Sequence, residues 1–277
     1  MEPSTNVIQR DIHFGIDGCD MRRWCNDDAC RTHFFSAMSI MFPEGEKFFI
    51  ESVRHYRDRI ADPQLQADVA GFIGQEAMHG REHRSYNIAL THAGYDAEGL
   101  ERRTLKQIAF TRKMLPPKGR LAVTIALEHF TAILADAMLT DDRILGNSDP
   151  RMAALWRWHA IEETEHKAVA FDVYKLVAPG FLGWLRRCAI MLSTSVIFWT
   201  HTLLNYFHFT RRDGIPFPTA AWRFFYNGFI TPGPLRRIQI PWLRYFSPGF
   251  HPWNHDNRGQ VERWKAAYAA SGQPPPS

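Results

Sequence analysis

A glutamate and a histidine three positions apart occur twice in this chain, each time in a stretch that favours a helix. QEAMHGREH contains Glu76 and His79, and HAIEETEH contains Glu163 and His166. Residues three apart lie on one face of a helix, so each pair offers a carboxylate and an imidazole to a common point. Such ligands suit iron or manganese, and the lack of thiolate argues against a structural zinc site. The two pairs therefore predict a metal centre.

Two further glutamates lie singly among apolar residues, Glu46 in FPEGEKFF and Glu128 in ALEHFTA. Burying four carboxylates without compensating positive charge would be strongly unfavourable, and no Lys or Arg lies on the faces predicted to point inward. A Glu from each of two helices plus a Glu-x-x-His from each of two others is the ligand set of ferritin-like dinuclear proteins. We predict two metal ions, iron in preference to manganese or zinc, bound by Glu46, Glu76, His79, Glu128, Glu163 and His166.

Three more residues near these ligands have alternative roles. Glu162 lies four residues before His166 and could replace or supplement Glu163, although the three-residue spacing favours Glu163. His83 lies on the same predicted face as His79. It is an additional ligand, a hydrogen-bond partner of a ligand or an ordinary buried histidine, and the same alternatives hold for His159.

Four helices are needed to position these side chains. Two long helices are predicted over 62–94 and 149–179, because each begins with Asp-Pro and ends at a Gly or a Pro-Gly pair. Shorter helices begin after Pro43 and Pro117, and residues 96–115 form a polar connecting helix. The order predicts an all-α, ferritin-like four-helix bundle of two helical hairpins joined by a long crossover.

The C-terminal third has a different composition. Residues 186–277 carry 11 Lys and Arg against 3 Asp and Glu, so they contribute +8 and the rest of the chain −4. The run 188–209 has no charged residue and could span a bilayer, but a helix buried against the bundle would look the same. The segment 222–257 mixes aromatic residues with Arg, Pro and Gly. It is expected to be irregular and to face a membrane interface or cover an apolar cavity.

These patterns divide the chain into an N-terminal segment (1–36), a metal-binding bundle (37–180) and a C-terminal region (181–277). The four cysteines form no disulfide framework or zinc motif, and the N-terminus lacks a signal-peptide pattern. We expect a cytoplasmic protein, with attachment to the inner face of the cell membrane left open by 188–209. The dispersed Arg residues argue against nucleic-acid binding. The apolar run and the aromatic segment favour a small hydrophobic molecule or lipid as the substrate. A homodimer is left open.

Four segments of the chain resemble a known family. FPEGEKFF, GFIGQEAMHGREH, ALEHFTA and WHAIEETEHKAVAFDVY, in this order and at these intervals, resemble the bacterial family of predicted metal-dependent hydrolases. The resemblance extends over residues 30–265, with no departure at the six predicted ligands. It implies a metal-binding helical domain, and the family name implies hydrolysis.

The ligand chemistry and the resemblance favour different functions. Four carboxylates around two metals favour an oxygen-activating di-iron oxidase or oxygenase acting on a hydrophobic substrate, because they stabilise high oxidation states and the bundle excludes water. The alternative is a metal-dependent hydrolase, in which two metals acidify a water molecule and polarise a carbonyl or phosphoryl oxygen. No GxSxG or HExxH motif indicates another hydrolytic site. A non-catalytic metal-binding protein is a third, less favoured function.

Overall fold

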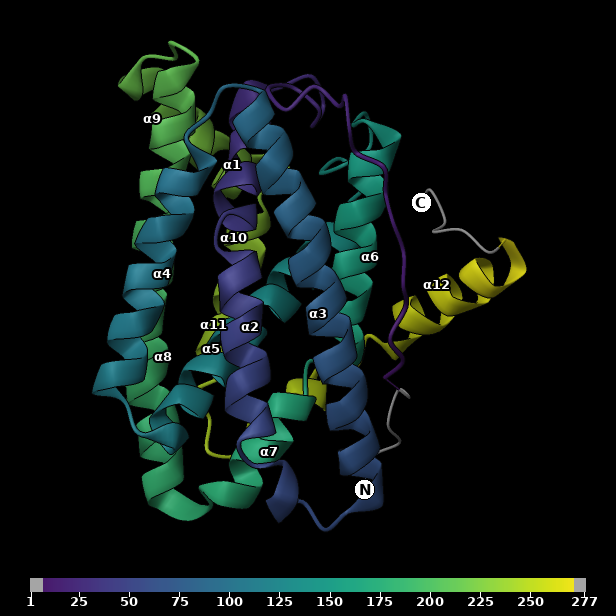
Figure 1. Cartoon of the computed structure of the whole chain (residues 1–277), viewed down its shortest axis with the longest axis vertical. Coiled ribbons are helices and arrows are strands. Elements are labelled where there is room, and N and C mark those ends of the chain that lie inside the picture. Colours follow the sequence, from purple (N-terminus) through teal and green to yellow (C-terminus); the bar gives the residue numbers. More distant parts are fainter. Residues whose placement is uncertain (1–6, 272–277) are drawn as a thin grey trace.

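The computed structural model describes residues 7–271, which form helices and contain no β-strand (Figure 1). The all-helical prediction is therefore confirmed for this part of the chain. The helices are α1 (Ala29–Ser39), α2 (Phe42–Arg54), α3 (Pro63–His92), α4 (Ala97–Met114), α5 (Pro117–Leu139), α6 (Pro150–His166), α7 (Val169–Val177), α8 (Gly180–Arg212), α9 (Phe217–Phe225), α10 (Pro234–Arg237), α11 (Gln239–Arg244) and α12 (Arg258–Ser271). Short 3₁₀ turns at Arg57–Arg59 and Pro252–Asn254 and a π-helical turn at Tyr226–Ile230 complete them.

The ends of α3 follow the local signals of the sequence. The Asp62 carboxylate accepts a hydrogen bond from the Gln64 amide, which satisfies one of the free N–H groups at the helix start. At the other end Gly94 adopts φ +90°, and the Tyr95 amide donates to the Leu90 carbonyl at 3.1 Å. This arrangement is a Schellman motif, which favours Gly because the left-handed conformation needs no Cβ.

The second long helix differs from its prediction. A single helix over 149–179 is wrong, because α6 ends at His166 and α7 begins at Val169. Lys167 and Ala168, between them, have no strong tendency to break a helix. Lys167 is buried, and its ammonium group donates to the Asn257 side chain at 2.7 Å and to the His255 carbonyl at 2.8 Å. The break therefore accompanies a tertiary contact with the C-terminal region.

The ligand-bearing helices lie side by side in the core (Figure 1). Helix α2 packs on α3 and α5, and α5 packs on α6 and α7, while α3 contacts both α6 and α7. The connecting helix α4 lies outside α2 and α3. Apolar clusters occupy the two ends of α3, with Tyr86 and Leu90 in one and Val69 and Phe72 in the other. The polar residues of α3 lie between these clusters.

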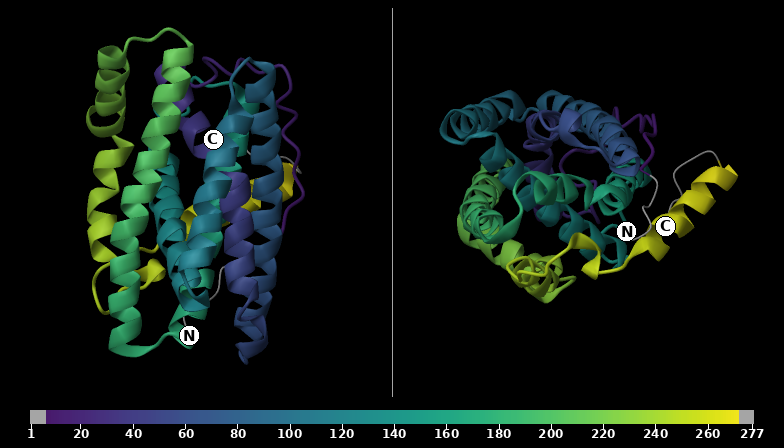
Figure 2. Two further views of the ribbon diagram at one scale, coloured as in Figure 1. Left: turned by 60° about the vertical axis from the view of Figure 1, so that its left-hand side comes forward. Right: turned by 90° about the horizontal axis from the view of Figure 1, so that it is seen from below.

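Helix α8 contains the charge-free run and extends over 33 residues. Helix α8 lies along the outside of the molecule (Figure 2). One side packs on α1 and α5, and the other leaves side chains such as Leu192, Val196 and Leu204 exposed. Two described helices, α5 and α8, are long and apolar enough to cross a membrane. The most apolar window of α5 is 61% buried and that of α8 is 33% buried. This composition is only weak support for membrane association.

The C-terminal region is more regular than predicted. The expectation of irregular structure over 222–257 is wrong in part, since α9, α10, α11 and the π-helical turn occupy much of it. Aromatic side chains that pack against α5 and α8 stabilise these short helices, for example Trp242, whose indole N–H donates to Ser195 at 3.0 Å. The predicted boundary at residue 36 falls inside α1.

Candidate metal centre

The structure brings all six predicted ligands, which lie on α2, α3, α5 and α6, into one cluster. Each of them is at most 2% exposed. The Nε2 atom of His166 lies 3.1 Å from Glu76, 3.4 Å from Glu128 and 3.5 Å from Glu163. The Nδ1 atom of His79 lies 3.6 Å from Glu163 and 4.0 Å from Glu76. These contacts join residues from α3, α5 and α6, and Glu46 on α2 belongs to a close group of donor atoms with Glu76 and His79.

Most donor atoms of the cluster lack a hydrogen-bond partner. Among the residues that the structure describes, no partner exists for either carboxylate oxygen of Glu46, Glu76 and Glu128, nor for Nδ1 of His79 and Nε2 of His166. Buried polar atoms are almost always hydrogen-bonded, so convergent exceptions need an explanation. Metal ions provide one, because carboxylate oxygens and imidazole nitrogens are their ordinary ligands. The donor set therefore fits metal binding.

The ligand atoms form overlapping groups, within each of which they lie no more than 4.8 Å apart. Glu46, Glu76 and His79 form one such group, and Glu76, Glu128 and His166 form a second. Glu76 belongs to both. Two neighbouring metal positions that share a carboxylate are compatible with this overlap.

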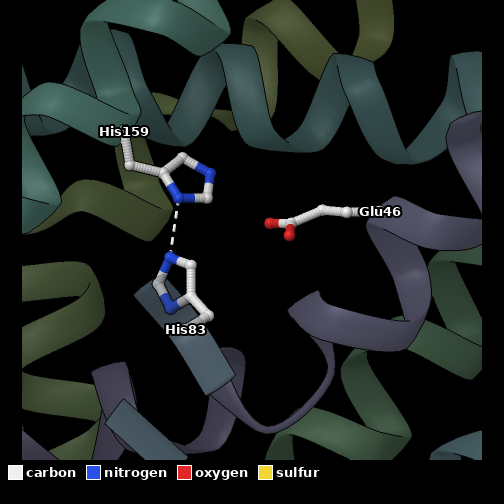
Figure 3. Close-up of side chains that lie close together, drawn as sticks. All are labelled: Glu46, His83 and His159. Atoms are coloured by element: carbon white, nitrogen blue, oxygen red, sulfur yellow. Dashed lines mark hydrogen bonds between the residues drawn. The ribbon is translucent and has the colours of Figure 1, made fainter. Parts of the chain in front are cut away.

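His83 and His159 lie beside the cluster and are hydrogen-bonded to each other. Their Nε2 and Nδ1 atoms are 2.7 Å apart, and the Glu46 carboxylate points toward the two rings (Figure 3). The other nitrogen of His159 lies 2.9 Å from Glu163 Oε1, while that of His83 lies 3.0 Å from the Ser39 hydroxyl. Hydrogen bonds thus run from Glu163 through both imidazoles to Ser39. Both histidines also belong to close groups of candidate ligand atoms, with Glu46 or with His79 and Glu163.

Glu162 lies on the side of the His79 ring that faces away from the cluster. Its Oε2 atom is 3.1 Å from His79 Nε2, whereas Glu76 and Glu163 approach His79 Nδ1. Its other oxygen accepts a hydrogen bond from Arg10 at 2.7 Å. Glu162 therefore lies where it can orient the His79 ring.

Three residues that the sequence did not single out as part of the site surround it. Gln75 approaches His166 Nδ1 with its amide oxygen at 2.9 Å and donates to Glu165 at 2.7 Å. Arg10, from the N-terminal segment, donates to Glu165 at 2.7 Å. Gln75 and Glu165 each directly precede a ligand, and this position in the sequence is a signal that they lie near the site. Arg10 has no such signal, because it is more than 150 residues from its partners.

The electrostatics of the metal-free cluster follow from burial and crowding. Burial and neighbouring carboxylates raise the pKa of Glu46 and Glu76 well above the usual range, and burial raises that of Glu128 to about 7. Burial opposes charge on His166 and Glu163 too, but the attraction of His166 to the carboxylates of Glu128 and Glu163 outweighs it. The pKa of His166 is therefore raised and that of Glu163 lowered. In the absence of metal, bound protons and the ion pair between His166 and Glu163 offset the negative charge of the cluster glutamates.

The chain was compared with known proteins. A family model described as predicted metal-dependent hydrolase matches residues 8–256. No curated protein and no solved structure matches. The family finding overturns the preference for an oxygen-activating di-iron oxidase or oxygenase. That preference rested on the ligand types, which serve two-metal hydrolysis equally well. By its match over most of its length, the chain belongs to the family of predicted metal-dependent hydrolases.

Proposed function

We propose that this protein is a metal-dependent hydrolase whose catalytic centre is the buried carboxylate and imidazole cluster. The observation that carries the proposal is the convergence of unpartnered donor atoms from six residues on four helices. Family membership supports the reaction class.

A ferritin-like four-helix bundle is the finer description of the fold that we propose. Helices α2 and α3 form one packed pair and α5 and α6 the other, with α4 in the long connection between the pairs. Each of α2 and α5 carries one Glu of the cluster, and each of α3 and α6 carries a Glu-x-x-His pair. This distribution of ligands is the one expected of that class.

Two metal ions would be held by the cluster, one by Glu46, Glu76 and His79 and the other by Glu76, Glu128 and His166. Glu163 is within reach of both histidines. Of the metals compatible with carboxylate and imidazole ligands, we favour iron, with manganese and zinc as alternatives.

Bound metals would supply Lewis acidity that polarises a carbonyl or phosphoryl oxygen and acidifies a water molecule. The chain itself contributes orientation and proton handling. Glu162 and Gln75 hold the outer nitrogens of His79 and His166, which sets the direction of each ring. The imidazole of His159, which is hydrogen-bonded to Glu163 Oε1 and to His83, can accept a proton that water loses.

Metal analysis combined with hydrolysis assays tests this function. Purified protein should contain two metals per chain and hydrolyse p-nitrophenyl esters, and chelation should abolish the activity. Glu128→Gln should lose at least one metal and lower kcat/KM by at least tenfold, because it removes a charged ligand. Glu98→Gln, an exposed acid on α4, is the matched control and should change neither. Hydrolysis that persists without metal, or two metals retained in Glu128→Gln, would contradict the proposal.

A further inference from the structure

A cavity of 280 Å³ reaches the metal cluster from the side of α4 and α8. Its walls come from α2, α4, α5, α6 and α8, and they include Glu46 and Glu163. A water molecule needs only about 10–15 Å³ of such volume. The space is therefore large enough for an organic ligand, and it ends at the groups that would hold the metals.

The lining of this cavity is almost entirely uncharged. Most of it is aliphatic or aromatic, as in Phe48, Ile108 and Leu127, and the two cluster glutamates are the only ionisable acids. No Lys or Arg contributes to the lining. A dry apolar wall favours a hydrocarbon chain, since such cavities exclude water and accept apolar ligands.

Apart from the cluster glutamates, a hydroxyl group on the cavity wall lacks a hydrogen-bond partner. Thr104 on α4 is 7% exposed, and its hydroxyl makes no hydrogen bond to any residue that the structure describes. Thr104 lines the cavity, so its hydroxyl is available to an oxygen atom of a ligand. An apolar cavity with one unpartnered hydroxyl fits a hydrocarbon that carries a neutral polar group.

Exposed apolar side chains mark the outer end of the cavity. Phe110 and Met114 on α4 are each 58% exposed, and Ile197 on α8 is 40% exposed. All three line the cavity, whereas Glu46 at its inner end is 2% exposed. The cavity thus leads from the surface between α4 and α8 to the cluster.

The net charge of the metal-loaded cluster indicates which kind of bond is hydrolysed. The carboxylates of Glu46, Glu76, Glu128 and Glu163 balance two divalent cations, and Glu162 and Glu165 are paired with Arg10. No surplus positive charge then remains to attract a phosphate diester. An uncharged carbonyl is the better match for this centre.

We propose that the cavity binds the aliphatic chain of a neutral acyl ester and places its carbonyl beside Glu46 and Glu163. This inference rests on the proposed hydrolase function. In the reaction the oxygen of water bonds to the acyl carbon and the acyl carbon–oxygen bond breaks. One water proton goes to the departing alcohol, and the carboxylic acid product releases the other.

A chain-length series tests the inference on the metal-loaded protein. With p-nitrophenyl esters from acetate to decanoate, kcat/KM should rise by roughly threefold to fourfold per added CH₂ until the cavity is full. Ile197→Trp should narrow the entrance and lower kcat/KM for decanoate at least tenfold, by more than it lowers kcat/KM for acetate. Leu182→Trp, on the same helix, 72% exposed and outside the cavity lining, is the matched control and should behave as wild type.

A binding measurement separates this inference from the proposed function. The non-hydrolysable ketone 2-dodecanone should bind wild-type protein in calorimetry and bind Ile197→Trp at least tenfold more weakly. Metal-dependent ester hydrolysis without chain-length preference would overturn the inference and leave the hydrolase intact. Binding of the ketone, blocked in Ile197→Trp, without hydrolysis of any ester would support the cavity's ligand and refute the hydrolase. Faster metal-dependent hydrolysis of bis-p-nitrophenyl phosphate than of the esters would overturn the neutral-ester assignment.

Discussion

At the scale of single residues, the environment of the ligands depends on two cations from outside the bundle, Arg10 in the N-terminal segment and Lys265 on α12, which lies 2.5 Å from Glu165. Arg10 is the partner of both Glu162 and Glu165, and these acids in turn contact His79 and, through Gln75, His166. A buried carboxylate that loses its counter-ion is strongly destabilising. The N-terminal segment therefore contributes to a site that it does not itself ligate.

Replacement of Arg10 tests this dependence. Arg10→Ala should lower the free energy of unfolding by about 3 kcal/mol, because Glu162 loses its counter-ion, and should weaken metal binding by about 10–100-fold, as loss of a ligand's hydrogen-bond partner does. Chemical denaturation and competition with a metal chelator measure the two effects. Arg23→Ala removes an exposed ion pair with Asp27 and serves as the control. Unchanged metal affinity in Arg10→Ala would show that the Arg10 ion pairs do not affect metal binding.

At the scale of elements, the close approach of α2 and α3 depends on Gly80, which has no side chain. A Cβ atom added at Gly80 on α3 would lie 3.2 Å from the Glu46 carboxylate on α2. Glycine is unfavourable within a helix, so its presence in the middle of α3 is consistent with a need for close approach at the cluster.

Gly80→Ala separates helix stability from metal binding. Alanine should stabilise the metal-free protein by up to about 1 kcal/mol through helix propensity. It should weaken metal binding several-fold, because the carboxylate of Glu46 must move away from its position. Thermal melts and metal titration measure these opposite changes. Gly45→Ala on α2, where a Cβ would meet no atom within 4 Å, should stabilise the helix without weakening metal binding. Equal metal affinity in Gly80→Ala and wild type would show that the carboxylate is not constrained there.

At the scale of the whole molecule, the cluster carboxylates should make metal-free protein less stable as pH rises above about 6.5. Burial raises the pKa of Glu128 to about 7, and the pKa of Glu76 is raised well above the usual range. A group with a higher pKa in the folded than in the unfolded state stabilises the fold while protonated, and this contribution is lost as pH rises through its folded pKa. Burial lowers the pKa of His79 and His83 instead, but both are mostly neutral in either state above about pH 6.5. Burial also lowers the pKa of Lys167 to about 7, so its contribution to stability rises with pH above 7. Lys167 lies outside the cluster, so its contribution cancels when metal-free and metal-loaded protein are compared.

Metal-loaded protein should show the opposite dependence on pH. Ions bind the deprotonated ligands, so metal affinity and the stability that it adds increase with pH. The difference in melting temperature between metal-loaded and chelator-treated protein should therefore increase from about pH 6.5 to about pH 8.5. Parallel curves would mean that the cluster carboxylates are compensated in another way.

The sequence by itself determined the helical fold class, the ends of α3 and the residues that meet in the cluster. These depend on local properties: Asp-Pro starts, a left-handed Gly94, and the three-residue spacing that places Glu76 beside His79 on one face. The resemblance of four segments was also enough to identify the family. Ligand types alone did not distinguish redox from hydrolytic chemistry, because one donor set supports both.

Only the tertiary structure decided the break after His166, the role of Arg10 and the cavity beside Glu46. Each depends on contacts between residues distant in the chain. Lys167 meets Asn257, Arg10 meets Glu162, and residues from five helices line the cavity. Local propensity contains no information about such contacts, because packing of the whole chain brings the partners together.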